Sequence, residues 1–302
     1  SFLCAIYTWH YVPKPGNAKA FVALMLLLET GMAGTFIAFD LILFFVFWEL
    51  VLVPMYFLIG VWGSANREYA SIKFFLYTLF ESVFMLLGFL AMYFRSDVAG
   101  AHTFDILQLQ AFAAQGGFST GFQLVAFGAI ALGFAVKVPM WPFHTWLPDA
   151  HTEAPTAGSV LLAAVLLKLG AYGLVRFNLG LFPDAAHTFA TAIEILAVIG
   201  IVYGAVVAIA QTDLKRLIAY SSVSHMGVVM LGAATLNVNG LNGSVFQMFA
   251  HGIMTGLFFA LVGLVYEKTH SREIFKMGGF GTMMPGIATA FTIGGLSSLG
   301  LP

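Results

Sequence analysis

The sequence predicts an all-α, polytopic transmembrane helix bundle, and three observations lead to this prediction. Hydrophobic residues make up 60% of the chain, charged residues make up 9%, and the mean hydropathy is +0.92. Soluble domains carry roughly 25% charged residues, so this chain has too few of them to cover its apolar surface in water. Apolar runs of about 20 residues, the length of one span, recur along the chain. One of these runs contains two prolines, which predict a broken helix.

The apolar runs give eight candidate spans and a further partial one. The longest connection without apolar character, residues 95–121, is expected to be an exposed loop or a short surface helix. In order, the candidate spans lie near residues 18–39, 41–62, 69–94, 121–149, 155–179, 187–210, 213–235 and 241–266, with another beginning near 283.

Neither end of the sequence resembles a natural terminus. There is no initiator Met, the stretch "SFLCAIYTWHYV" is too short to span, and "TIGGLSSLGLP" stops inside an apolar run. The first stretch also lacks the basic residues that open a signal peptide. We therefore expect residues 1–302 to be a single membrane domain and an internal piece of a longer protein.

The basic residues predict the orientation of the spans. If the helices simply alternate in direction, nine basic residues fall on one side and two, Arg95 and Arg176, on the other. The rich side is expected to be cytoplasmic, because cytoplasmic loops carry an excess of Lys and Arg. The nine are Lys14, Lys19, Arg67, Lys73, Lys215, Arg216, Lys268, Arg272 and Lys276.

Several classes of function are excluded by composition and motifs. One cysteine, Cys4, allows no disulfide framework, CxxC pair or thiolate-held cluster. A net charge of −1 argues against a nucleic-acid surface. No phosphate-binding loop and no His/Cys spacing for a metal, haem or flavin occurs.

The stretch "GFAVKVPMWPFHTWLPDAH" holds the least expected residues. It places Lys137 deep in an apolar run, followed by Pro139, Pro142 and His144. Proline lacks an N–H and its ring clashes with the preceding turn, so the helix should break between Val138 and Phe143. Broken membrane helices persist only where the freed carbonyls face protein or a water-filled cavity. We therefore expect the freed carbonyls to face a polar cavity, with Lys137 and His144 at its border.

Other titratable groups lie equally deep in the candidate spans. A charged side chain at mid-membrane costs roughly 2.5–3.5 kcal/mol, so each should face protein or water and have a partner. Each has an alternative interpretation as a static interhelical contact or a hydrogen-bonded packing residue, and for Glu29 and Glu81 both interpretations stay open. The functional candidates are Glu49, Lys137, Lys168, His144, His225 and His251.

Burial suggests the chemistry of these groups. Desolvation disfavours the charged forms of lysine and glutamate alike, and a nearby opposite charge restores them. A buried lysine with a carboxylate neighbour can therefore lose and regain its proton when that neighbour moves. We expect Glu49 and Lys137, at similar depth, to contact each other directly or through one water.

Three segments carry a resemblance to a known family. They are "FFVFWELVLVPMYFLIGVWG", "VKVPMWPFHTWLPDAHTEAPTAGSVLLAAVLLKLGAYGLVRF" and "QTDLKRLIAYSSVSHMG". They resemble the antiporter-like, proton-pumping subunits of respiratory complex I (NADH:quinone oxidoreductase). Within these, "DAHTEAPTAGS" followed by "LLKLGAYG" resembles the chain M branch, to which mitochondrial subunit 4 is related.

The resemblance implies a fourteen-helix protein built from two inverted five-helix repeats, each with one broken helix. Residues 18–179 would form the first repeat, and residues 187–302 a truncated second repeat. Pro302 would then lie at the second helix break.

The resemblance also implies roles for particular residues. Glu49 matches the family's glutamate on the fifth helix, Lys137 the lysine on the broken seventh, and Lys168 the lysine of the eighth. His225 and His251 match the histidines of the central polar axis. The family's exit residue lies beyond Pro302, and Glu81 stands where a small or polar residue is expected.

The predicted function is that of a proton-translocating membrane-arm subunit of a redox-driven NADH:quinone oxidoreductase. NADH, FMN, iron–sulfur clusters and quinone are expected on partner chains, and no redox centre on this one. The expected partners are other membrane-arm subunits, lipid and protons, in the bacterial inner (plasma) membrane. Two alternatives remain, a subunit of a multisubunit sodium/proton antiporter and a structural membrane subunit without an ion path.

Overall fold

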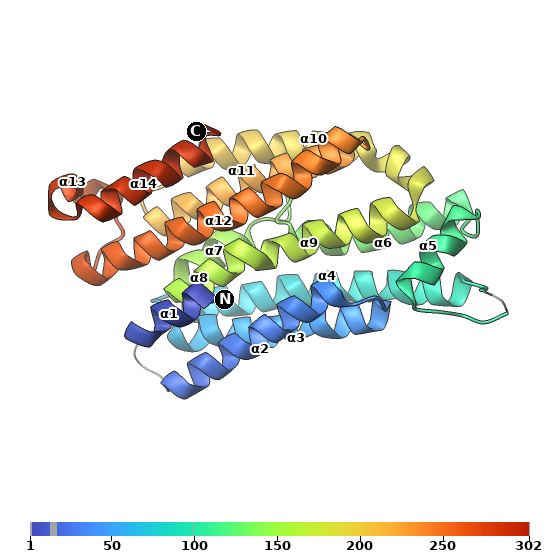
Figure 1. Cartoon of the computed structure of the whole chain (residues 1–302), viewed down its shortest axis with the longest axis horizontal. Coiled ribbons are helices and arrows are strands. Elements are labelled where there is room, and N and C mark those ends of the chain that lie inside the picture. The colour runs from blue at the N-terminus through green and yellow to red at the C-terminus, as the bar shows by residue number, and fades with distance from the viewer. Residues whose placement is uncertain (1, 13–16, 99, 302) are drawn as a thin grey trace.

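The fold is a bundle of long helices that run roughly along one axis of the molecule (Figure 1). The computed structural model describes residues 2–12, 17–98 and 100–301. Within these ranges there is no β-strand, only three isolated β-bridges. Eight helical segments in the described part of the chain are long and apolar enough to cross a membrane, which confirms the predicted all-α class and span count.

The helices follow the order expected from the apolar runs. Their bounds are α1 (Phe2–His10), α2 (Ala18–Ile37), α3 (Leu41–Trp62), α4 (Arg67–Arg95), α5 (Ile106–Ala114), α6 (Thr120–Lys137), α7 (Trp146–Glu153), α8 (Thr156–Leu161), η1 (Leu162–Leu166), α9 (Leu167–Gly173), η2 (Leu174–Leu179), α10 (Pro183–Ile209), α11 (Leu214–Ala234), α12 (Val238–Thr269), η3 (Ile274–Lys276), α13 (Phe280–Met283) and α14 (Pro285–Ser298). Segments η1 and η2 are π-helical and η3 is a 3₁₀ helix. Helix α5 is the short helix expected between residues 95 and 121.

Short polar side chains begin several of the long helices. Asp40 accepts hydrogen bonds from the first backbone N–H groups of α3, and Asp213 and Asn237 do the same for α11 and α12. A capping oxygen replaces the helical partner that these N–H groups lack. Each helix therefore starts at a fixed residue, and the depth of every later residue in that span follows from it.

The bundle has two outer groups of helices, and a third group lies between them. Helices α2, α3 and α4 pack in sequence, as do α10, α11 and α12. Segments α6 to α9 lie between the two groups, with α6 and α7 against α4, α7 against α11, and α8 against α12 (Figure 1). The central segments are thus the ones in contact with both groups.

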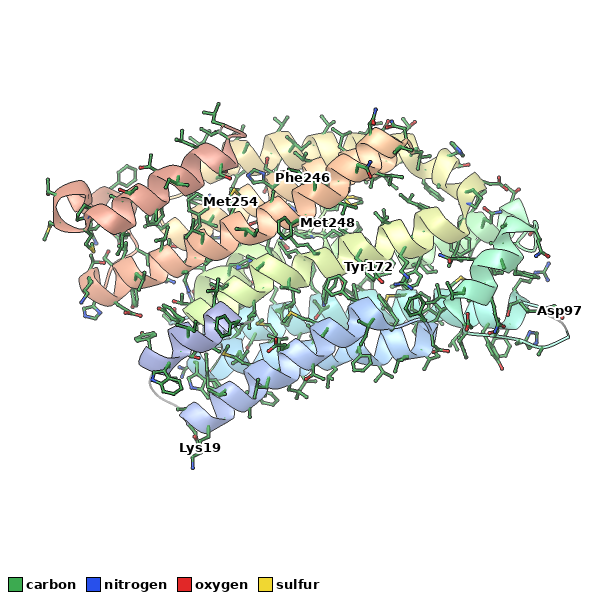
Figure 2. The ribbon with its side chains drawn as sticks, in the orientation of Figure 1. Lys19, Asp97, Tyr172, Phe246, Met248 and Met254 are labelled. Atoms are coloured by element: carbon green, nitrogen blue, oxygen red, sulfur yellow. The ribbon has the colours of Figure 1, made fainter. Side chains whose placement is uncertain are left out.

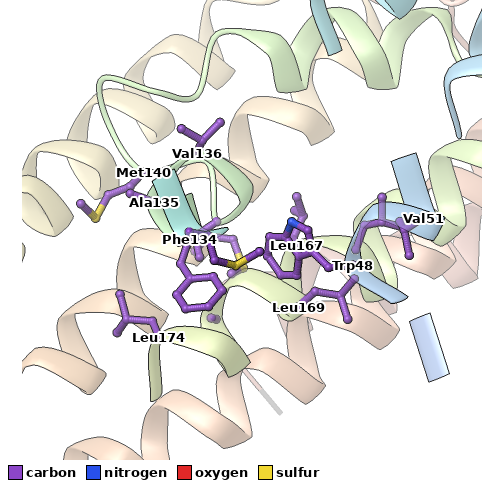
Figure 3. Close-up of a cluster of buried hydrophobic side chains, with 14 of the residues drawn as sticks. Trp48, Val51, Phe134, Ala135, Val136, Met140, Leu167, Leu169 and Leu174 are labelled. Atoms are coloured by element: carbon purple, nitrogen blue, oxygen red, sulfur yellow. The ribbon is translucent and has the colours of Figure 1, made fainter. Parts of the chain in front are cut away.

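Aromatic side chains fill the core between α3, α4, α6 and η2. The ring of Phe134 lies 5.4 Å from that of Trp48 and 6.0 Å from that of Phe177 (Figure 3). Small residues allow close helix contacts elsewhere: a Cβ at Gly204 would stand 2.7 Å from the backbone nitrogen of Ser224. Small residues are typical of closely packed membrane helices. Gly204 is therefore a position where α10 and α11 pack closely.

The two ends of the bundle differ in charge. Arg67, Lys73, Arg216 and Arg272 lie at one end, where Lys73 Nζ pairs with Asp149 Oδ2 (2.7 Å). Lys19 and Asp97 mark opposite ends of the molecule (Figure 2). Lys14 lies outside the described residues. The alternating arrangement assumed for the basic residues agrees with the bundle, while its cytoplasmic assignment stays a prediction.

Candidate functional site: buried titratable groups across the bundle

The predicted helix break is present directly after Lys137. Helix α6 ends at Lys137 and α7 begins at Trp146. Met140 N donates to Ala135 O, five residues back, so the regular helical hydrogen bonding does not continue through Met140. The interruption between Val138 and Phe143 is confirmed.

The freed carbonyl before the break has a protein partner. Trp146 Nε1 donates to Val136 O (2.9 Å), and both groups are buried. We expected the freed carbonyls to face a polar cavity, and for Val136 this is wrong. The indole N–H satisfies that carbonyl directly, as the low-dielectric surroundings require.

Lys137 is buried beside a carboxylate. Its side chain is 1% exposed, and its Nζ lies 3.3 Å from Oε1 of Glu81, which is fully buried on α4. The same Nζ lies 4.9 Å from the ring centroid of Trp48 and 6.0 Å from that of Phe74. A carboxylate and two aromatic faces all favour the ammonium form.

The expected direct contact between Glu49 and Lys137 is not made. These two residues form no ion pair within 4.0 Å, whereas Glu81 and Lys137 do. Glu49 Oε1 is buried without a hydrogen-bond partner in the described part of the chain, and Glu49 directly follows Trp48, whose ring lies near Lys137 Nζ. Helix α4 approaches α6 closely at Gly133, where a Cβ would stand 3.1 Å from Glu81 O. This close approach brings Glu81 to the lysine.

Lys168 is a second buried lysine, and its partners differ in kind. Its Nζ donates to Ala163 O (2.7 Å) and lies 2.5 Å from Nδ1 of His251 on α12. No carboxylate lies within 4.0 Å of this Nζ among the described residues. The π-helical segments η1 and η2 flank α9, which carries Lys168. Single π-helical turns frequently occur at functional sites.

His251 and His225 continue the line of polar groups from Lys168. Their ring centroids are 5.5 Å apart at an interplanar angle of 45°. His225 Nδ1 lies 3.1 Å from Gln247 Nε2, and its Nε2 lies 3.2 Å from Ser298 Oγ. An amide nitrogen only donates, so Nδ1 accepts and Nε2 carries the ring proton. The expected inward orientation of both histidines is observed, and their role in proton transfer stays a prediction.

His144 stands apart from these groups. It is buried just beyond the break, and neither ring nitrogen has a hydrogen-bond partner in the described ranges. Its ring lies edge-on to that of Tyr203, with 5.0 Å between centroids. Glu29 likewise has no ion pair among the described residues and is exposed on α2. The structure does not bring either residue to the Lys137 or Lys168 groups.

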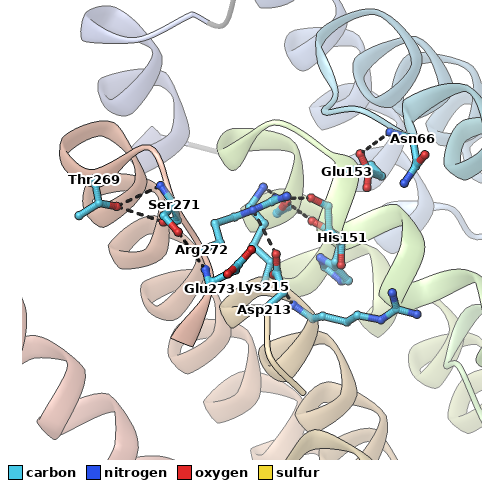
Figure 4. Close-up of polar contacts among 12 residues, drawn as sticks. Asn66, His151, Glu153, Asp213, Lys215, Thr269, Ser271, Arg272 and Glu273 are labelled. Carbon is cyan, nitrogen blue, oxygen red and sulfur yellow. Dashed lines mark hydrogen bonds and ion pairs between the residues drawn. The ribbon is translucent and has the colours of Figure 1, made fainter. Parts of the chain in front are cut away.

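Two titratable residues at the basic end escaped the sequence analysis. His151 is fully buried and stacks on Phe259 (4.6 Å, 7°). Lys215, counted among the loop residues, is 5% exposed, and its Nζ donates to Ala154 O (2.6 Å) and lies 3.4 Å from Ser159 Oγ (Figure 4). Both lie at the ends of apolar runs, where sequence alone predicts exposure. The sequence signal that could have found them was the stretch "DAHTEAP" at the end of α7, whose Ala154 O accepts a hydrogen bond from Lys215.

Ion pairs and hydrogen bonds close the same end of the bundle around α7. Asp149 pairs with Lys73 and Arg216, and Glu153 Oε2 accepts from Asn66 N (3.0 Å). Arg272 Nη1 donates to Thr152 O (2.6 Å) (Figure 4). These contacts join loops distant in sequence and hold the second half of the broken helix in place.

The arrangement of spans and buried charges matches one family. The profile of the family described as "NADH:quinone oxidoreductase/Mrp antiporter, TM" matches residues 38–302. The chain belongs to this family. It is therefore a multi-pass membrane protein.

Relatives within the family are longer than this chain. NADH-quinone oxidoreductase subunit M of Rickettsia bellii is 47% identical over 302 residues, which cover all of this chain and 59% of the relative. The subunit M of Rhodobacter capsulatus is 46% identical over 97% of this chain and 58% of the relative. An NAD(P)H-quinone oxidoreductase chain 4 of Trichormus variabilis is 44% identical over 99% of this chain and 54% of the relative. The chain thus spans less than two thirds of the curated relatives it matches.

Solved structures show the same fold. A chain of respiratory complex I from Thermus thermophilus has a TM-score of 0.88 at 35% identity, covering 93% of this chain and 59% of that one. A chain of an archaeal membrane-bound sulfane sulfur reductase has a TM-score of 0.91 at 28% identity, covering 100% and 60%. A chain of an Mrp complex from Dietzia sp. has a TM-score of 0.83 at 24% identity, covering 92% and 51%, and shows the fold alone.

Proposed function

We propose that this chain is part of a proton-translocating membrane-arm subunit of a redox-driven NADH:quinone oxidoreductase. The observation that carries the proposal is the set of buried titratable groups on successive helices. Glu81 and Lys137 form an ion pair, while Lys168, His251 and His225 form a second connected group. Ionisable residues at membrane depth mark ion and proton pathways. The names of the relatives at 44–47% identity support the same proposal.

In the proposed mechanism, the protonation of Lys137 depends on nearby carboxylates. When a neighbouring negative charge approaches, the lysine keeps its proton; when that charge withdraws or is neutralised, the proton is released. Glu49 is close enough to influence Lys137 and remains the carboxylate that we expect to respond to events elsewhere in the complex. The released proton passes to Lys168, whose Nζ adjoins His251.

The histidines would carry the proton toward the second half of the protein. A neutral imidazole accepts a proton on one nitrogen and releases one from the other, so a histidine pair can relay it. His251 and His225 lie on α12 and α11 with neighbouring rings. Moving one charge against 100 mV costs about 2.3 kcal/mol, which a change in one buried charge pair is large enough to supply.

The remaining features of the proposal concern the whole protein. Residues 18–179 and 187–302 would be the first repeat and part of the second. Partner chains would bind NADH and hold the electron carriers, namely FMN, iron–sulfur clusters and quinone. This chain would itself contact other membrane-arm subunits. The protein would lie in the bacterial plasma membrane, surrounded by lipid, with its basic end in the cytoplasm.

The experiment that tests this function uses inside-out vesicles carrying the whole complex. NADH should drive proton uptake into the vesicles at equal rates with and without sodium, and a protonophore should abolish the gradient. Sodium-dependent proton movement without NADH would instead indicate the antiporter alternative. Pumping at the wild-type rate after Lys137→Ala and Lys168→Ala together would leave only a structural subunit without an ion path.

A further inference from the structure

The site around Lys137 contains two carboxylates and one lysine. Glu81 is 0% exposed and Lys137 is 1% exposed, with 3.3 Å between Oε1 and Nζ. Glu49 directly follows Trp48, whose ring centroid lies 4.9 Å from the same Nζ, and Glu49 Oε1 is buried without a hydrogen-bond partner among the described residues. A switch of one lysine and one glutamate would not need this third group, so its presence calls for a physical explanation.

The packing holds Glu81 firmly next to the lysine. Glu81 lies on α4 opposite Gly133, which is one helical turn before Lys137 on α6. A Cβ at Gly133 would stand 3.1 Å from Glu81 O and 3.1 Å from Met85 Cβ, so a side chain at this position would push the two helices apart by a few tenths of an ångström. The backbones of the two helices therefore fix the carboxylate at the broken end of α6.

Glu81 has few of the contacts that stabilise a structural carboxylate. Neither of its oxygens has a hydrogen-bond partner of good geometry in the described part of the chain. Glu153, by contrast, accepts a hydrogen bond from Asn66 N, and Asp149 accepts one from Lys73 Nζ. A buried carboxylate that only one cation stabilises gains or loses its charge with that cation.

Charge balance then limits the states of the site. With Lys137 charged and both glutamates ionised, one negative charge would stay buried without a counter-ion, which is unfavourable in a low dielectric. No other cation lies within 4.0 Å of Glu81 among the described residues. One of the two carboxylates therefore carries a proton while the lysine is charged.

We propose that Glu81 is a second proton-carrying carboxylate of this site, which exchanges a proton with Lys137 while Glu49 controls the exchange. In the exchange, an N–H bond of the ammonium breaks and an O–H bond forms on Glu81, which converts the ion pair into a neutral pair. The reverse step restores the pair. This inference rests on the proposed function and deepens it by assigning Glu81 to the same proton path.

The test compares Glu81→Gln, Glu49→Gln and the double variant in vesicles of the whole complex. Gln keeps the size of the side chain and removes the exchangeable proton. We expect E81Q to lower NADH-driven proton uptake on the order of a hundredfold, the lower end of the range that a positioned proton carrier contributes. E49Q should keep residual uptake that E49Q/E81Q loses. Glu68→Gln, on the exposed first turn of the same helix, is the matched control and should pump normally.

Two further measurements separate a proton carrier from a structural residue. The pH profile of uptake should change shape in E81Q, because one titrating group is removed, and should be unchanged in E68Q. Infrared difference spectra of the whole complex should show a carboxylic acid C=O band that E81Q loses. Normal uptake and an unchanged pH profile in assembled E81Q would overturn this inference. If Lys137→Ala also pumped normally, the proposed function itself would fail.

Discussion

Lys137 and Lys168 are both buried on neighbouring central helices, but they differ in what surrounds their ammonium groups. Lys137 pairs with the carboxylate of Glu81 and lies over the Trp48 ring. Lys168 has a backbone carbonyl and an imidazole nitrogen as partners. A formal negative charge holds an ammonium far more strongly than dipoles do. In the proposed mechanism, this difference means that the first lysine keeps its proton until its neighbours change and the second passes one on.

The largest expected effect comes from replacing Lys137 by alanine in the full complex. Truncation removes the ammonium group that pairs with Glu81 and leaves this carboxylate without its counter-charge, so the carboxylate should stay protonated. We expect proton uptake to fall on the order of 10²-fold or more. In a tightly coupled complex, quinone reduction should fall with it. Proton uptake and NADH oxidation are measured in the same vesicles.

Other substitutions at Lys137 refine this prediction. Methionine, apolar and of similar length, should behave like alanine, and arginine should also fail because its guanidinium does not release a proton. Lys276→Ala is the matched control, since Lys276 forms an exposed ion pair with Glu273 that contributes little. Wild-type rates in an assembled Lys137→Ala complex would make Lys137 a structural residue.

The second effect should be smaller and of a different kind. Lys168→Met removes the donor to Ala163 O and His251 Nδ1 but leaves no buried carboxylate unpaired. We expect proton uptake to fall on the order of tenfold. Loss of the donor to the buried Ala163 O should cost the complex about 1–3 kcal/mol, less than the roughly 3–5 kcal/mol expected for breaking the ion pair of Lys137. Thermal dissociation of the purified complex measures the stability of the Lys168→Met and Lys137→Ala variants. Equal destabilisation by these two substitutions would contradict the comparison of the two lysines.

A third prediction concerns Gly170, which lies between the two lysines. A Cβ at Gly170 would stand 2.9 Å from Lys137 Cβ and 3.0 Å from Phe134 O, closer than real Cβ contacts allow. Gly170→Ala should therefore push α9 away from α6, destabilise the complex by about 1–3 kcal/mol and slow proton uptake severalfold. Gly128→Ala, which faces open space on α6, is the control and should be neutral or stabilising. Normal stability of the Gly170→Ala complex would show that α9 and α6 are not tightly packed at this position.

The smallest effect is expected at the break itself. Trp146→Phe keeps an aromatic ring but removes the N–H that donates to Val136 O. An unsatisfied buried carbonyl costs about 1–3 kcal/mol, so the thermal stability of the complex should fall while proton uptake changes little. A large loss of uptake without a loss of stability would mean that the indole acts in the proton path and not only as a cap.

The spans and the break could be predicted from the sequence because both depend on local properties. An apolar run of about 20 residues forms a span whatever its neighbours are, and Pro139 and Pro142 break a helix in any surroundings. The burial of Lys137 and Lys168 also followed from their depth in such runs. The π-helical turns around Lys168 could not be predicted, because a single extra residue in a helical turn leaves the apolar pattern nearly unchanged.

The partner of Lys137 was decided by the tertiary structure alone. Glu49 and Glu81 lie at similar depth, and sequence periodicity does not say how far α3 and α4 stand from α6. The close approach at Gly133 brings α4 and Glu81 to the lysine. Lys215 shows the same limit: its place at the start of α11 predicted exposure, yet it is buried and donates a hydrogen bond to Ala154 O, directly after α7. Depth in the membrane is a property of one helix, whereas the pairing of buried charges depends on how several helices pack together.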